Sequence, residues 1–262
     1  MKIISIILIG IIQGFLEWLP ISSSGQISVI LMKFLNINPS EAFQISLTLH
    51  MGTALTSIIV FRNIIFRDMY EKIKYKNFRD PIFLIVLLSP FFSLLTGLPA
   101  FLILKHHLKE LSTEIVTSVI GFFLIITGLI QMKRKSKAYA YKKLSSLNVK
   151  DTIILGLIQG FSIIPGISRS AITITCLLAL RYKGEDAFII SFIASIPPSL
   201  AIGIYGLREN FTYESIIGII AAFLTGLISI KTMLTLSRKL KFSLLLIVLG
   251  LIMIFQLILL TL

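Results

Sequence analysis

Long apolar runs separated by short polar segments make up most of this 262-residue sequence. An α-helix needs about 20 predominantly apolar residues to cross a bilayer. Six of the runs reach roughly this length, and they cover residues 43–61, 81–105, 113–132, 187–206, 214–236 and 242–262. The pattern therefore predicts an all-α polytopic membrane protein.

Four further apolar runs are too short or too interrupted to cross, and they come in two pairs. Each pair is broken by a proline that is followed by serines, at Pro20 and at Pro165. Proline ends a helix, and bent backbone inside a bilayer is tolerated only where protein or a cavity covers it. We therefore expect two re-entrant helix hairpins, at residues 3–35 and 152–182, that dip into the membrane and return.

The two halves of the sequence repeat each other. With a shift of 146 positions, GIIQGF matches GLIQGF and ISSS matches ISRS; the matched segments are 10–15 with 156–161 and 21–24 with 167–170. With a shift of 145, AFQIS matches AFIIS, at 42–46 and 187–191. Coincidence explains this poorly, because the shared positions include Gln, Gly and Ser as well as the common Ile and Leu.

The repeat predicts a simple layout, in which each half is one hairpin followed by three transmembrane helices. The first repeat spans 1–132, a basic cytoplasmic linker spans 133–151, and the second repeat spans 152–262. Because each half crosses the membrane an odd number of times, the second copy should have inverted topology.

Basic residues indicate which side of the membrane faces the cytoplasm. Of the 25 Lys and Arg residues, 19 fall in the predicted loops of one side and five on the other, with Arg169 in the second hairpin. Cytoplasmic loops carry an excess of Lys and Arg. Both termini and the mouth of the first hairpin should therefore lie outside, and the second hairpin should enter from the cytoplasm.

Composition narrows the class further. The chain is 56% hydrophobic and 14% charged, with a mean hydropathy of +0.95 and a net charge of +13. Because the positive charge lies in short loops between apolar runs, we expect it to anchor a multi-pass plasma-membrane protein and not to bind nucleic acid. The single cysteine, Cys176, excludes a disulfide framework and a cysteine metal site.

The break in the second hairpin carries an unusual set of polar residues. Ser168 is a good N-cap for the helix that follows, and the N–H groups at a helix start favour an anion. Arg169 adds a planar, permanently charged fork that suits phosphate oxygens, with Ser170 and Thr173 close by. We interpret the segment as an anion cradle within the membrane; a helix break with a snorkelling arginine is the alternative.

The break in the first hairpin carries a carboxylate. Gln13 and Glu17 are four residues apart and so share one helix face. Glu17 is the only acid inside an apolar segment, and such a group is costly unless it is paired or hydrated. Arg169, at the equivalent depth of the inverted copy, is its natural partner. A purely structural ion pair is one interpretation, and it leaves the neighbouring serines without a role.

These residues have the properties that phosphate-ester hydrolysis needs, which are a nucleophile, a proton acceptor and positive charge over the phosphoryl oxygens. Ser23 or Ser22 could attack, Arg169 could clamp the phosphate, and Glu17 could take the proton or hold a divalent cation, Mg²⁺ or Ca²⁺. The candidate phosphate-binding residues are Gln13, Ser22, Ser24, Gln26, Gly166, Ser168, Ser170 and Thr173.

Two questions stay open at the level of the sequence. His50 lies within the first predicted span and is either a buried, hydrogen-bonded histidine or a group that handles protons at the cavity. A transporter or flippase of a lipid phosphate or small anion is the rival to a hydrolase, because inverted repeats with broken helices are a common transporter plan.

The residues resemble the undecaprenyl-diphosphate phosphatases of the bacitracin-resistance type. Two signatures carry the resemblance: (Glu/Gln)-x-x-x-Glu followed by Leu-Pro-x-Ser-Ser, at 13–23, and Pro-Gly-x-Ser-Arg-Ser-x-x-Thr, at 165–173. The similarity covers nearly the whole chain. It implies removal of the terminal phosphate from a long polyprenyl diphosphate at the outer face, which recycles the lipid carrier of cell-envelope glycan synthesis. It further implies Ser23 as nucleophile, Glu17 and Arg169 as essential partners, and help from a divalent cation.

One position departs from the family. Where the family usually carries a histidine after Ser-Ser-x-Gly, this chain has Gln26. Glutamine cannot carry a proton in turnover. Either Glu17 does that work, or His50 substitutes, or activity is reduced.

Overall fold

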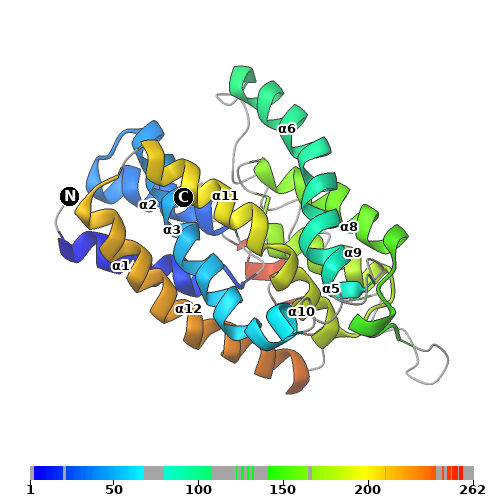
Figure 1. The fold of residues 1–262 in the computed structure, drawn as a ribbon. Helices are drawn as coiled ribbons and strands as arrows, with labels where there is room; N and C mark the ends of the chain where they lie inside the picture. Colours follow the sequence, from blue (N-terminus) through cyan, green and yellow to red (C-terminus); the bar gives the residue numbers. More distant parts are fainter. Residues whose placement is uncertain are drawn as a thin grey trace.

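The protein is helical throughout the part that the computed structural model describes, which confirms the predicted all-α class (Figure 1). The described residues are 3–19, 22–67, 80–107, 141–164, 167–209 and 211–239, with scattered helical positions at 122–132 and 244–255. The first half contains α1 (Ile3–Leu16), α2 (Ser23–Leu35), α3 (Pro39–Val60), the π-helix η1 (Asn63–Arg67), α5 (Pro81–Phe83), the π-helix η2 (Leu84–Leu88) and α6 (Ser89–His107). The second contains η3 (Leu144–Ser146), α8 (Val149–Gly160), η4 (Phe161–Ile163), α9 (Arg169–Ala179), α10 (Gly184–Ala194), α11 (Ile196–Glu209) and α12 (Tyr213–Lys239).

Four helical stretches are long and apolar enough to cross a membrane, namely Pro39–Val60, Pro81–Ala100, Gly184–Arg208 and Tyr213–Leu236. They overlap the predicted spans 43–61, 81–105, 187–206 and 214–236. The shorter helices α1 and α9 are also apolar and fall within the two predicted hairpins. Most of the predicted spans 113–132 and 242–262, and residues 133–140 of the linker, lie outside the described residues.

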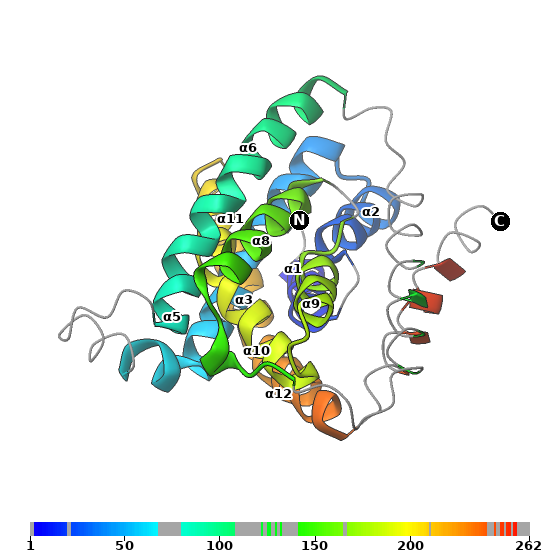
Figure 2. The ribbon, with the colours of Figure 1, turned by 90° about the vertical axis from the view of Figure 1, so that its right-hand side faces the viewer.

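The first helix of each hairpin packs on a long helix of the other half. Helix α1 lies along α12, and α8 lies along α6 (Figures 1 and 2). Glycines make both approaches close. A Cβ on Gly10 would overlap the carbonyl oxygen of Gly218 and lie 2.8 Å from the Cβ of Ala221. A Cβ on Gly156, the matching residue of α8, would lie 2.5 Å from the carbonyl oxygen of Ser89 and 2.8 Å from the Cβ of Phe92.

The receiving helices carry a sequence repeat of their own. LTGL occurs in α6 and in α12 with a shift of 129 positions, at 95–98 and 224–227. Thr96 and Gly97 meet Gly160, and Thr225 and Gly226 meet the corresponding Gly14. The two crossings are therefore built from the same small residues. The shift is smaller than 146 because 20 residues lie between the end of α3 and the start of α5, whereas three lie between α11 and α12.

A buried carboxylate fastens the linker to the second hairpin. Asp151, at the start of α8, accepts hydrogen bonds from Lys142 Nζ and from the Tyr182 hydroxyl, both at 2.7 Å. Its backbone N–H is capped by Asn148 at 2.9 Å. Lys142 and Tyr182 are also joined by an isolated parallel bridge. This cluster ties the two ends of the hairpin together and so fixes where its other end, the break between α8 and α9, lies.

The larger hydrophobic cluster includes Trp18, which follows the end of α1 at the first break. Trp18, directly after Glu17, is buried with its ring 5.0 Å from that of Phe192 in an edge-to-face contact. Phe188 stacks edge-to-face on Phe192 at 5.5 Å. Aromatic pairs of this geometry add to the free energy gained from burial. They hold the end of α1 against α10, and this contact positions the first break.

Candidate active site

The two broken helices meet end to end. Helix α1 stops at Leu16, and α2 begins at Ser23 with Ser22 as N-cap, its side chain accepting the N–H of Gly25. In the other hairpin, Ser168 is the N-cap of α9 and accepts the N–H of Ala171 at 3.2 Å. Ser22 and Ser168, the first serines of the repeated ISSS and ISRS segments, therefore each cap the start of a helix. N–H groups at a helix start favour an anion nearby.

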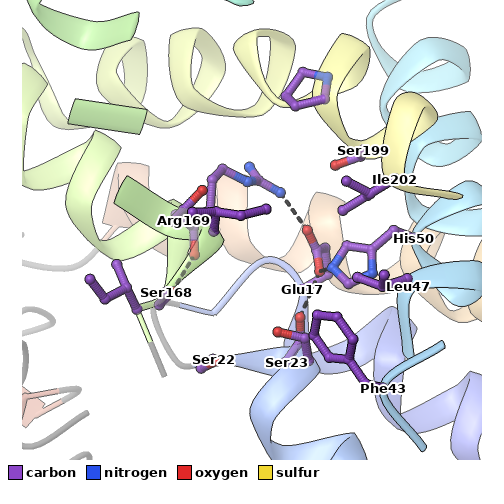
Figure 3. A pocket seen from close by; sticks show the side chains of 16 residues that line it. Glu17, Ser22, Ser23, Phe43, Leu47, His50, Ser168, Arg169, Ser199 and Ile202 are labelled. Carbon is purple, nitrogen blue, oxygen red and sulfur yellow. Dashed lines mark hydrogen bonds and ion pairs between the residues drawn. The ribbon is translucent and has the colours of Figure 1, made fainter. Parts of the chain in front are cut away.

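A direct ion pair joins the two breaks. Arg169 Nη2 donates to Glu17 Oε1 (Figure 3). The Ser170 hydroxyl adds a second link, because it donates to the carbonyl oxygen of Leu19 at 2.8 Å. A carboxylate and a guanidinium from opposite halves of the chain thus share one site, as their positions at the two breaks indicated.

The second oxygen of Glu17 collects several polar groups. Glu17 Oε2 accepts hydrogen bonds from Gln13 Nε2 at 2.9 Å and from the Ser23 hydroxyl at 2.8 Å. His50 Nε2 lies 3.4 Å from the same oxygen. Because both oxygens are engaged, Glu17 holds the orientation of Ser23 and of Arg169 at once.

His50 reaches this carboxylate from α3 in a fixed orientation. Its Nδ1 lies 2.8 Å from the carbonyl oxygen of Ser46. A carbonyl oxygen only accepts, so we assign the proton of the neutral ring to Nδ1. Nε2 is then the unprotonated nitrogen, and it is the one that faces Glu17.

These groups surround a cavity that encloses about 730 Å³ including its open mouth (Figure 3). Eight of the residues predicted from the sequence line it, namely Glu17, Ser22, Ser23, Ser24, His50, Ser168, Arg169 and Ser170. Gln13 does not line the cavity, but its side chain donates a hydrogen bond to Glu17. Gln26 is half-buried on α2, away from the lining. Thr173 is buried, and its hydroxyl is hydrogen-bonded to Arg169 O and to Ser191 Oγ. Gly166 lies outside the described residues.

The rest of the lining was not predicted from the sequence, and it consists of Phe43, Leu47, Ser162, Ile163, Ile167, Pro198, Ser199 and Ile202. A signal existed for two of them. Phe43 and Leu47 precede His50 by seven and three positions and therefore share its helix face. No pattern of this kind marks Ser199, on α11.

The polar groups fit a phosphate better than a resident metal ion. In the part of the chain that the structure describes, no group of three or more His, Cys, Asp or Glu side chains could hold a metal. Among the described residues of the lining Glu17 is the only carboxylate, and protein groups already engage both of its oxygens. A guanidinium, hydroxyls and two helix N-termini are donors that match phosphoryl oxygens.

Comparison with known proteins assigns the chain to a family. The model of the bacitracin resistance protein BacA family matches residues 6–252. The chain belongs to this family. An undecaprenyl-diphosphatase of Methanococcoides burtonii is 36% identical over 247 residues, covering 90% of this chain and 91% of the relative. Two relatives of the same name are each 33% identical. The match to the one from Methanothrix thermoacetophila covers 96% of this chain and 96% of the relative. The match to the one from Methanopyrus kandleri covers 93% of this chain and 92% of the relative.

Membership of the BacA family agrees with the resemblance drawn from the two signatures. The signatures provide Glu17, Ser23 and Arg169, and the contacts described above join these residues within the cavity. His50 comes from outside both signatures.

Proposed function

We propose that this protein is an integral membrane phosphatase that hydrolyses a long-chain, undecaprenyl-like diphosphate to the monophosphate and inorganic phosphate. The reaction would recycle the lipid carrier of cell-envelope glycan synthesis. One observation carries the proposal: Ser23, Glu17 and Arg169 form a connected unit on the wall of one cavity. The names of the relatives support the same activity.

In the proposed reaction, Ser23 attacks the terminal phosphorus and the bond to the bridging oxygen breaks. The prenyl monophosphate leaves, and Glu17, which already accepts the Ser23 hydrogen bond, takes the proton. Water then hydrolyses the phosphoserine, which restores the serine and releases phosphate. Arg169 stabilises the charge that develops on the phosphoryl oxygens. The apolar part of the lining, including Phe43, Leu47 and Ile202, would receive the start of the prenyl chain.

The decisive experiment is phosphate release by the purified protein from a long-chain prenyl diphosphate. Release that requires Glu17 and Arg169 supports the proposal. The rival function is transport of a lipid phosphate or small anion through the same cavity, and the relatives' names, which describe hydrolysis, do not favour it. Flux of labelled lipid in liposomes without phosphate release would point to transport and against a phosphatase.

The two adjacent serines should separate into different roles. Ser23→Ala removes the hydroxyl bonded to Glu17, and we expect turnover to fall by at least about 10³-fold. Ser22→Ala removes only the cap of α2, and we expect it to cost about 1 kcal/mol of stability while turnover stays close to normal. Rates and unfolding midpoints of both variants test this. Loss of turnover in Ser22→Ala alone would exchange the assignments.

His50 should serve as the proton-handling group next to Glu17. In His50→Gln the side-chain amide is placed to contact the carboxylate but cannot carry a proton, so we expect kcat to fall by roughly 10²-fold with little change in KM. His50→Asn offers a donor to Ser46 in place of Nδ1 and serves as the packing control. If both variants turn over normally, the imidazole is only structural.

A divalent cation, Mg²⁺ or Ca²⁺, is proposed to arrive together with the diphosphate. The phosphate oxygens would supply most of its ligands, and Glu17 would be the carboxylate of the described lining that could add a ligand. When bound, the ion would neutralise part of the charge on the substrate. Turnover measured after chelation and after readdition of each ion tests this proposal.

The proposed membrane arrangement is an inverted repeat of a re-entrant hairpin and three spans, with the cavity open to the outer face of the plasma membrane and both termini outside. The matching crossings of α1 on α12 and of α8 on α6 support the repeat. Labelling of single cysteines tests the orientation. A cysteine replacing Thr212 should react from outside, and one replacing Tyr141 should react only from the cytoplasm.

A further inference from the structure

Seven serines line the cavity, and their hydroxyls fall into two groups. Four of them hold the hairpin ends: Ser22 and Ser168 cap helices, Ser23 donates to Glu17, and Ser170 donates to Leu19. The other three are Ser24, Ser162 and Ser199, and none of their hydroxyls makes a hydrogen bond within the described part of the chain. These three hydroxyls are therefore available to bind a ligand that enters the cavity.

Ser199 is the most buried of the three, with 5% of its surface exposed. Buried hydroxyls in membrane helices usually bond back to a carbonyl oxygen one turn earlier, as Thr48 does to Gln44 at 2.9 Å. Ser199 does not, although its backbone N–H does bond Ser195 O at 2.9 Å. Its hydroxyl lines the cavity without a partner among the described residues, so it is available to bind a water molecule or a ligand there.

The surroundings of Ser199 indicate the charge of that partner. Figure 3 shows the Ser199 hydroxyl on the side of the ion pair opposite Ser23, directed towards the guanidinium of Arg169. Arg169 Nη1 is itself buried without a partner among the described residues. The guanidinium nitrogen and the hydroxyl can both donate to one ligand on this side, and a phosphoryl group, which is rich in acceptor oxygens, fits them.

We propose that Ser199 binds an oxygen of the second phosphate of the substrate, the one attached to the prenyl chain, and so favours a diphosphate over a monophosphate. The inference rests on the proposed function. The terminal phosphate must lie beside Ser23 to be attacked, so a donor across the ion pair reaches the neighbouring phosphate. Ile202, one turn further along the same face of α11, also lines the cavity. Along this face the polar Ser199 is followed by the apolar Ile202, just as the phosphates of the substrate are followed by its isoprenoid chain.

The test compares Ser199→Ala with Ser195→Ala. Ser195 lies one turn earlier on the chain, is buried outside the cavity lining, and uses its hydroxyl on Phe192 O at 2.6 Å. For Ser199→Ala we expect KM for a prenyl diphosphate to rise about tenfold with kcat nearly unchanged, as the loss of one hydrogen bond to a charged oxygen predicts. Ser195→Ala should leave both constants close to normal.

Binding without turnover separates this inference from the proposed function. Calorimetry with methylenediphosphonate, which is not hydrolysed, should show about tenfold weaker binding to Ser199→Ala, while inorganic phosphate binds both proteins alike. Unchanged binding of the diphosphonate would overturn the proposal and leave Ser199 with a water molecule only. Equal weakening for phosphate and diphosphonate would also overturn it, because Ser199 would then belong to a single phosphate site. Alanine is a good helix former, so the variant should fold.

Discussion

Replacing Arg169 by alanine should reduce phosphate release by about 10³-fold or more, a loss as large as the one expected for the nucleophile Ser23. Arg169 pairs with Glu17, and its Nη1 is the donor left for phosphoryl oxygens. Arg169→Lys should recover little, because a single ammonium cannot hold the carboxylate and the phosphate together. Arg62→Ala removes an exposed guanidinium that, among the described residues, bonds only Ile59 O, and it is the matched control.

A purely structural role for the ion pair makes a different prediction. Removing one partner of a buried pair destabilises a protein, whereas replacing both by neutral groups is often tolerated. The double variant Glu17→Gln/Arg169→Met should therefore regain much of the stability that Arg169→Ala loses. We expect it to remain inactive. Recovery of phosphate release in the double variant would show that the pair serves the fold alone and would remove the basis of the proposed function.

Enlarging Gly10 or Gly156 should cause the largest loss of stability. Backbone carbonyl oxygens, of Gly218 and Ser89 respectively, occupy the space that a Cβ needs, so rotation of a side chain cannot relieve the clash. Alanine should cost about 1–3 kcal/mol at either position, and leucine should prevent accumulation of folded protein. Unfolding midpoints in detergent would measure this.

Two comparisons make the glycine test specific. Ile11→Phe enlarges an exposed neighbour on α1 and should leave the midpoint almost unchanged. The losses at Gly10 and Gly156 should be of similar size, because the two crossings are built alike. A tolerant Gly156 beside an intolerant Gly10 would contradict the idea that the halves pack in equivalent ways.

The charged part of the site could be predicted from the sequence, and the cause is physical. Glu17 and Arg169 stand out because ionised groups in apolar segments need partners. The serine caps Ser22 and Ser168 stand out because a helix that restarts after a proline needs one. The shift of 146 placed the two breaks in equivalent positions, and this led to the expectation that the charges meet.

The wall formed by α3 and α11 could not be predicted in the same way. Lipid-facing and protein-facing sides of a membrane helix are both apolar, so periodicity does not reveal which side is covered. Only the bond of His50 Nδ1 to Ser46 O shows that its Nε2 faces the carboxylate. Ser199 is one of many serines in the chain, and what distinguishes it is a missing hydrogen bond, which no sequence pattern records.

The crossing of α1 on α12 has a consequence for biosynthesis. The partner of Gly10 is Gly218, so α1 waits for a segment made about 200 residues later. At ordinary rates of synthesis this delay is roughly 10 to 40 s. Throughout that time the glycine face of α1 lacks the helix that covers it in the folded protein.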